Sequence, residues 1–100
     1  MLAADRTRGV ALLNLQERLA AKATLYEADL AELIGMRAVR QLVMTLTSEG
    51  WELQVLPSWK QQFLTLVSLR NERRHYTSLD RLLKTITKHG PLPPTILIGD

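Results

Sequence analysis

The fold prediction depends on residues 24–51, which read TLYEADLAELIGMRAVRQLVMTLTSEGW. Thr24 and Glu27 have the spacing of a capping box, in which a hydroxyl and a carboxylate satisfy the first free N–H groups of a helix. Gly35 can adopt the left-handed conformation that ends a helix without steric cost. We therefore expect a short helix up to Gly35, a tight turn, and a second helix that ends at Gly50.

Apolar residues recur at helical spacing in both parts of this stretch. The positions expected to face inward are Leu30, Leu33, Ile34, Val39, Leu42, Val43 and Leu46. The positions left outside or at the edge of the second helix are Arg37, Arg40, Gln41, Met44 and Thr45. A short helix, a sharp turn and a longer helix with Arg and Gln outward is how a helix-turn-helix presents side chains to a DNA groove.

The outer positions of the second helix are the candidates for base contacts. Arg37 and Arg40 could pair with guanine and Gln41 with adenine. Met44 and Thr45 could contact a thymine methyl group, although a methionine there is more often part of the core. The alternative for the three polar residues is a solvated helix face, since Arg and Gln are good helix formers. No acidic side chain accompanies them, which favours DNA contact.

Regular patterns continue on both sides of this stretch. Residues 8–22 predict an amphipathic helix with a leucine stripe, capped by Asp5 or Thr7. Beyond the second helix the apolar residues alternate, which predicts a strand. A turn at residues 57–60 then leads into a second strand at residues 63–69. The two strands would form a β-hairpin.

The last third of the chain predicts a helix over residues 79–89, capped by Thr77 or Ser78. A short strand follows at residues 95–98. Because residues 63–69 are apolar on both faces, we expect that strand to lie centrally in a sheet.

Composition indicates a small packed protein. The 100 residues suffice for one domain, with 46% hydrophobic and 23% charged. The absence of cysteine excludes disulfides and thiolate metal sites, and no apolar run reaches the roughly 20 residues of a membrane helix. The N-terminus has no signal-peptide pattern, so a cytoplasmic location is expected.

Charge is distributed unevenly along the chain. The net charge is +3, of which residues 1–35 contribute −1 and residues 36–100 contribute +4. Such a bias is typical of nucleic-acid binding, and equally of a small protein that charge keeps soluble.

Basic residues outside the second helix are candidates for phosphate contacts. They are Lys60 in the turn between the two strands, and Arg70, Arg73 and Arg74 in the polar stretch after them. For this stretch a solvated loop is an equal alternative. Arg81, Lys84 and Lys88 follow one face of the late helix. Such a row is usually the outside of an amphipathic helix, and it would face DNA only if the protein were turned around from this arrangement.

No pattern predicts an enzyme. The two histidines, His75 and His89, lack metal-ligand spacing. No phosphate loop, catalytic carboxylate pair or activated nucleophile is evident. Ser78, Asp80 and His75 are close in sequence, but proximity alone does not make a triad. We therefore expect no cofactor, no metal and no small-molecule substrate.

The runs DLAELIG and VRQLVMTLTSEGW resemble the winged helix-turn-helix transcriptional regulators. Many of these proteins carry a Leu-Ala pair in helix two and an apolar ladder in helix three. The matching residues here are Leu30 and Ala31, then Val39, Val43, Leu46 and Gly50. The resemblance covers about residues 8–69.

The resemblance implies an α+β fold, winged-helix-like, in a single domain over residues 1–100. A three-helix N-terminal bundle with the helix-turn-helix would occupy residues 8–50, and a β-hairpin wing residues 51–69. A C-terminal helix and short strand at residues 77–98 would serve dimerisation.

The sequence is compatible with two functions. The first is sequence-specific binding of double-stranded DNA by a homodimer with no membrane contact. By analogy it would be a small repressor or a plasmid partition or maintenance factor. The alternative is a protein-interaction or assembly module whose basic residues only keep it soluble. A salt titration of duplex binding separates the two, because phosphate contacts weaken steeply as salt rises.

Overall fold

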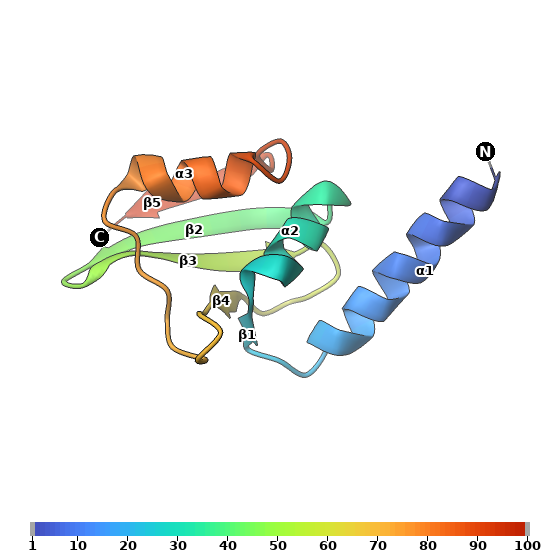
Figure 1. The fold of residues 1–100 in the computed structure, drawn as a ribbon, viewed down its shortest axis with the longest axis horizontal. Coiled ribbons are helices and arrows are strands. Elements are labelled where there is room, and N and C mark those ends of the chain that lie inside the picture. The colour runs from blue at the N-terminus through green and yellow to red at the C-terminus, as the bar shows by residue number, and fades with distance from the viewer. Residues whose placement is uncertain (1, 100) are drawn as a thin grey trace.

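The computed structural model describes the backbone of residues 2–99 and the side chains of residues 9–99. Within these residues the helices are α1 (Leu2–Leu19), α2 (Glu27–Gly35) and α3 (Leu79–Thr87) (Figure 1). The strands are β1 (Thr24–Leu25), β2 (Val39–Thr47), β3 (Gly50–Pro57), β4 (Leu64–Leu66) and β5 (Thr95–Gly99). They form one mixed sheet in the order β1-β4-β3-β2-β5. The β2–β3 and β3–β4 pairs are antiparallel, and β1–β4 and β2–β5 are parallel.

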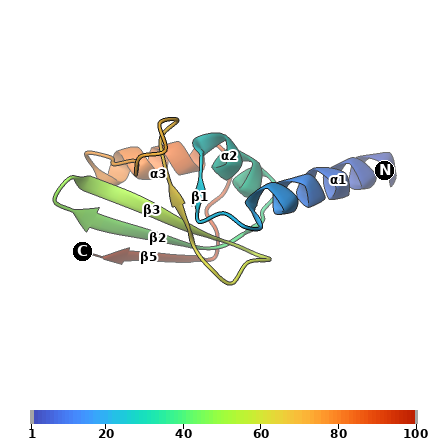
Figure 2. The same ribbon diagram turned by 90° about the horizontal axis from the view of Figure 1, so that it is seen from below.

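Helices α2 and α3 lie on one face of the sheet, and no described helix covers the other face (Figures 1 and 2). The cross-strand pairs Leu42–Val55 and Met44–Leu53 are fully buried in the core. Helix α1 extends away from the sheet, and Leu19 near its end reaches the core. Among the described residues, no helix has the length and apolar character needed to cross a membrane.

The stretch expected to be a recognition helix is strand β2, so the predicted three-helix bundle, helix-turn-helix and wing are wrong. Val39, Val43 and Leu46 recur at helical steps, but Leu42 and Met44 also alternate with half-buried residues. Both periods fit the sequence of this segment. Strand β2 is bonded to β3 on one side and to β5 on the other. These pairings with other segments of the chain stabilise the extended conformation over the helix.

The turn after α2 is built differently from the expectation. Ala38 N donates to Leu33 O at 2.8 Å and Arg37 N to Ile34 O at 3.0 Å, the two hydrogen bonds of a Schellman motif. The left-handed residue of this motif is Arg37, with φ of 55°, and not Gly35. A glycine is the usual occupant of that position, which is why the sequence placed the left-handed residue at Gly35. The predicted end of the helix at Gly35 is confirmed.

The starts of the first two helices also differ from the prediction. Thr24 lies in β1, and α2 begins at Glu27, where Tyr26 N donates to Asp29 Oδ2 at 3.1 Å. The carboxylate of the capping box is therefore supplied by Asp29. Helix α1 begins at Leu2, before the expected caps Asp5 and Thr7, whose side chains lie outside the described residues.

The second half of the chain largely matches the sequence patterns. Strand β3 alternates as expected, and β4 lies between β1 and β3, although it spans only Leu64–Leu66. The pairing of β3 with β4 is correct, but the longer partner of β3 is β2. Helix α3 is capped by Ser78, whose Oγ accepts from Arg81 N at 3.2 Å. Strand β5 forms where a short strand was predicted, and the structure pairs it with β2.

A backbone pairing beyond β4 brings the polar connection against the sheet. Trp51 N donates to Tyr76 O at 2.8 Å, and Tyr76 N to Trp51 O at 2.9 Å. Gly50 allows this approach, because a Cβ there would lie 2.8 Å from Tyr76 O. The end of the connection between β4 and α3 is thereby held against the start of β3.

Candidate nucleic-acid interface

The five predicted base-contacting residues do not share one helical face. Met44 is fully buried in the core. Gln41 and Thr45 are half-buried on the sheet face away from the helices. Arg40 donates from Nη2 to Lys60 O at 3.1 Å, and Arg37 occupies the turn after α2. The expected groove-reading surface is therefore wrong, because the segment that was to carry it is extended.

Lys60, expected to touch a phosphate, lies inside the protein. It is 7% exposed, and its Nζ donates to Leu19 O at 3.2 Å, Ala20 O at 3.1 Å and Lys22 O at 3.4 Å. Leu19 is the last residue of α1, and Ala20 and Lys22 lie in the turn that follows it. A positive charge is favoured at the C-terminal end of a helix, where backbone C=O groups lack helical partners. The ammonium therefore caps α1 and is not a phosphate contact.

The arginines of the connection between β4 and α3 are at the surface. Arg70 is exposed. Arg73 pairs with Glu52 at 3.4 Å and keeps 66% of its side chain exposed. Arg74 pairs with Glu27 at 3.2 Å, and its Cζ lies 5.3 Å from the centre of the Tyr76 ring. All three expected phosphate-contacting arginines thus lie on the outside of the molecule.

Helix α3 adds its own cations beside this connection. Arg81, Lys84 and Lys88 are exposed, one or two turns apart along the helix. Lys88 pairs with Glu27 at 3.2 Å. Within residues 9–99 neither Arg81 nor Lys84 has a carboxylate within 4.0 Å, so their charges face solvent.

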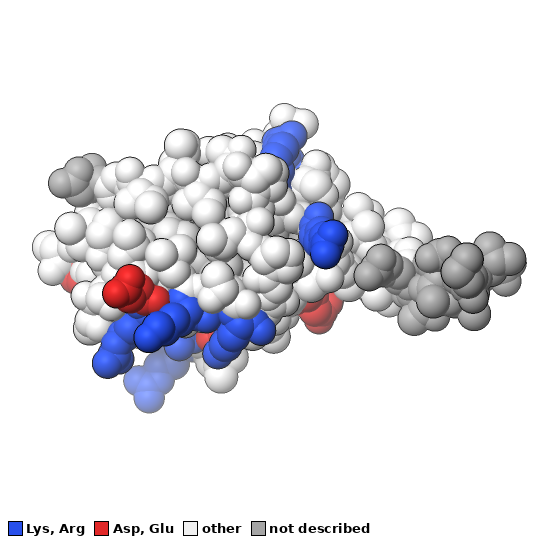
Figure 3. All heavy atoms as spheres, turned by 90° about the horizontal axis from the view of Figure 1, so that it is seen from above, with Lys and Arg blue, Asp and Glu red and all other residues white. Residues whose placement is uncertain are grey.

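An open hollow of about 510 Å³ joins the two basic segments. Its lining residues are Arg74, His75, Tyr76, Thr77, Arg81, Lys84 and Thr85. Figure 3 views the molecule from the side of α3 and shows several Lys and Arg side chains gathered on one part of the surface. Residues 70–88 contain six basic and two acidic side chains, which gives this segment a net charge of +4. The rest of the chain is therefore slightly negative, because the net charge of the whole chain is +3. We call the surface formed by Arg70, Arg73, Arg74, Arg81, Lys84 and Lys88 the basic face.

Glu27, at the start of α2, fixes the edge of the basic face. Its carboxylate lies 3.2 Å from Arg74 Nη1, from Lys88 Nζ and from His89 Nε2. Partial burial raises the pKa of Glu27, but the hydrogen bonds from Lys88 and His89 and the charge of Arg74 outweigh this effect. The pKa of Glu27 is therefore lowered from its usual 4.5. Glu27 thus links α2 to the connection and to the end of α3.

The other histidine, His75, pairs with acidic residues of β3 and of the turn before it. His75 Nε2 is 2.7 Å from Glu52 Oε2 and 3.5 Å from Glu49 Oε2, in a polar hollow that Glu72 also lines. No group of three His, Asp or Glu residues among the described side chains is arranged to hold a metal ion.

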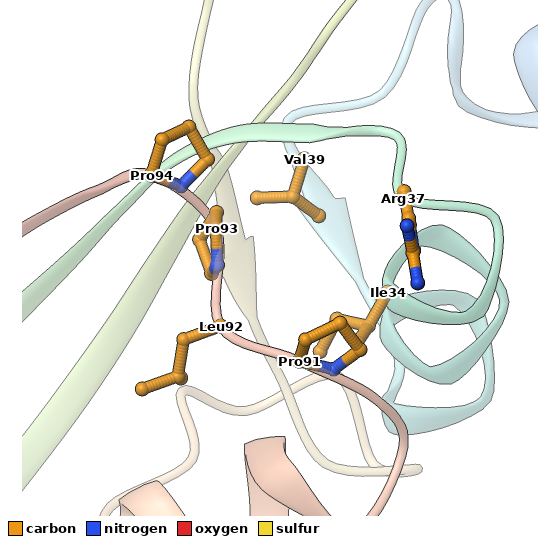
Figure 4. Close-up of a pocket in the computed structure, with 7 residues that line it drawn as sticks. All are labelled: Ile34, Arg37, Val39, Pro91, Leu92, Pro93 and Pro94. Carbon is orange, nitrogen blue, oxygen red and sulfur yellow. The ribbon is translucent and has the colours of Figure 1, made fainter.

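An apolar hollow of about 310 Å³ lies between the turn after α2 and residues 91–94 (Figure 4). Ile34, Val39 and Leu92 line it together with three prolines, and Arg37 lies at its side. Its lining contains no acid, histidine or hydroxyl group, so it offers no acid–base or nucleophilic chemistry.

Comparison of the chain with protein-family models, curated proteins and solved structures gives no match. The basic face is therefore the feature from which a function can be argued. The row on α3 was visible in the sequence as a three- and four-residue repeat. The sequence did not show that this row is continuous with the arginines of the connection, because their continuity depends on the pairing of Trp51 with Tyr76.

Proposed function

We propose that this protein binds double-stranded DNA through phosphate contacts made by the basic face. The observation that carries the proposal is the pair Arg81 and Lys84, which point to solvent without a neighbouring carboxylate among residues 9–99. An unpaired cation can bind a phosphate without first breaking an ion pair, and each phosphate neutralised releases counterions from the duplex.

The dimensions of the basic face suit a duplex backbone. Arg81 and Lys88 are seven residues apart on a helix, which corresponds to about 10 Å along its axis. A duplex carries about six phosphates over that length. Arg70, Arg73 and Arg74 extend the surface sideways from α3, toward a second backbone segment. The proposed contacts position the protein on DNA and do not read its sequence.

Sequence-specific repression and plasmid partition rested on a recognition helix and a wing. The segments assigned to them are strands of the central sheet, so the proposal is limited to backbone binding.

The test is fluorescence anisotropy of a labelled duplex titrated with protein at several salt concentrations. For the wild type, the logarithm of the affinity falls linearly with the logarithm of the salt concentration. In the double variant Arg81→Gln/Lys84→Gln, two phosphate contacts are lost. We expect the slope to become shallower by about 2, with weaker binding to every duplex alike.

The matched control is Lys22→Gln/Arg37→Gln, which removes the same charge. Lys22 follows α1 and Arg37 follows α2, and both are exposed outside the basic face. The control should retain the slope of the wild type. Equal weakening by both double variants would show that only net charge matters, and the assignment of the basic face would be wrong. No duplex binding by the wild type at low salt would reject the function itself.

A further inference from the structure

Strand β5 leaves one edge of the sheet open. Within residues 2–99 it pairs only with β2 and stands last in the strand order (Figure 2). Its outward N–H and C=O groups therefore have no backbone partner in this part of the chain. Such an edge is a template for another strand, and proteins usually protect it with lysine, proline, a bulge or a covering segment.

Residues 95–99 themselves contain no lysine, proline or bulge. The strand reads TILIG, without charge or proline, and its register with β2 is unbroken from Thr95 to Gly99. Leu97 is 52% exposed and Ile98 is 54% exposed. In a chain with 23% charged residues, this edge is an uncharged, aliphatic strip. The other edge strand, β1, has only two residues.

We propose that β5 pairs antiparallel with β5 of a second copy of this chain, about a two-fold axis at Leu97. In that register Leu97 lies opposite Leu97 of the second copy, and Ile96 lies opposite Ile98. Every aliphatic side chain of the strip then faces another aliphatic side chain on the same side of the sheet, the kind of pair that stabilises adjacent strands. A strand with this self-complementary sequence fits a copy of itself.

The charge distribution favours the same partner. Two molecules of net charge +3 repel one another, and the repulsion is least where the contact carries no charge. Residues 95–99 form such a contact, and the basic face lies on other elements.

The pairing would place the basic faces of both copies on one side of the dimer, a consequence that rests on the proposed DNA binding. A two-fold axis through an antiparallel strand pair is perpendicular to the sheet, so α3 of both copies lies on the same side of a ten-stranded sheet. The two basic faces would then meet one duplex together. Linked sites bind more tightly than either alone when the geometry allows both to engage.

Self-association is tested without nucleic acid, so that its outcome is independent of the proposed function. Sedimentation equilibrium of the wild type, from micromolar to millimolar concentration, should show a monomer–dimer equilibrium. Leu97→Lys places two ammonium groups opposite each other and should weaken the dimer about tenfold. Leu97→Glu should do the same with two carboxylates.

An equimolar mixture of the Leu97→Lys and Leu97→Glu variants should recover dimers, because unlike charges then face each other. The control Leu13→Lys alters a leucine of α1 that is 59% exposed and should leave dimerisation unchanged. A wild type that stays monomeric throughout would overturn the proposal. So would single variants that dimerise like the wild type, or a mixture that remains monomeric. Circular dichroism of each variant checks that the fold is retained.

Discussion

Replacing Lys60 by methionine should destabilise the protein by about 2 kcal/mol. Methionine retains the length and most of the volume of the side chain but removes the ammonium that donates to the carbonyls of Leu19, Ala20 and Lys22. Hydrogen bonds to a charged group contribute roughly 1.5–3 kcal/mol net, and a cation at a helix C-terminus up to about 2 kcal/mol. These contributions overlap, and burial of the ammonium offsets part of them.

The assay is urea unfolding followed by circular dichroism, with the free energy of unfolding compared between variants. A loss of 2 kcal/mol corresponds to a fall of roughly 10 °C in Tm for a domain of this size. Hydrogen exchange should also show faster opening of the last turn of α1, because its carbonyls lose their partner.

The control for Lys60 is Lys22→Met, which removes an exposed lysine of the same region. It should leave the free energy of unfolding within about 0.5 kcal/mol of the wild type. If Lys60→Met were as stable as this control, the ammonium would be in water, and the account of the α1 cap would be refuted.

Two further predictions concern the turn after α2 and the Glu27 network. Arg37→Gly should raise the free energy of unfolding by about 0.5–1 kcal/mol in urea unfolding, because glycine adopts φ of 55° without strain; Arg37→Ala, which keeps a Cβ, should give no such gain. Glu27 has a lowered pKa, so its stabilising effect is complete above pH 4.5 and is lost as pH falls through the lower pKa of the folded state. The stability difference between the wild type and Glu27→Gln, measured by urea unfolding from pH 7 to pH 3, should therefore shrink with acid; a constant difference would contradict this.

Segments with a local signal were predicted well from the sequence. Helix α3 combines a serine cap with leucines and an isoleucine at helical spacing, and both features act within a few residues. Strand β3 shows its alternation without reference to any neighbour. These elements could be identified because their own residues determine their periodicity and their ends.

Strand β2 could not be identified in this way. Its residues fit a helical stripe and a strand alternation equally well, and its β-branched members, among them Val39, Val43 and Thr45, were the available hint. The end of α2 at Gly35 was predicted correctly, but the left-handed position after it is occupied by Arg37, where a glycine is usual. Because β2 was assigned as a helix, its pairing with β3 was missed, and β3 was assigned instead to the wing of a winged helix.

The acidic residues of α2 determine which cations of the basic face are paired, a role that the sequence did not predict for them. Asp29 and Glu32 hold Arg18 of α1 at 3.2 and 2.9 Å, and Glu27 holds Arg74 and Lys88. A cation that is paired with a carboxylate must break this ion pair before it can bind a phosphate. Once α2 has taken its partners, the cations that remain unpaired on the outer face of α3 are the ones on which DNA binding should depend. Glu27→Gln would release Arg74 and Lys88, so it should strengthen duplex binding in the anisotropy assay while it destabilises the fold. Weaker binding by this variant would show that the Glu27 network is needed to shape the basic face.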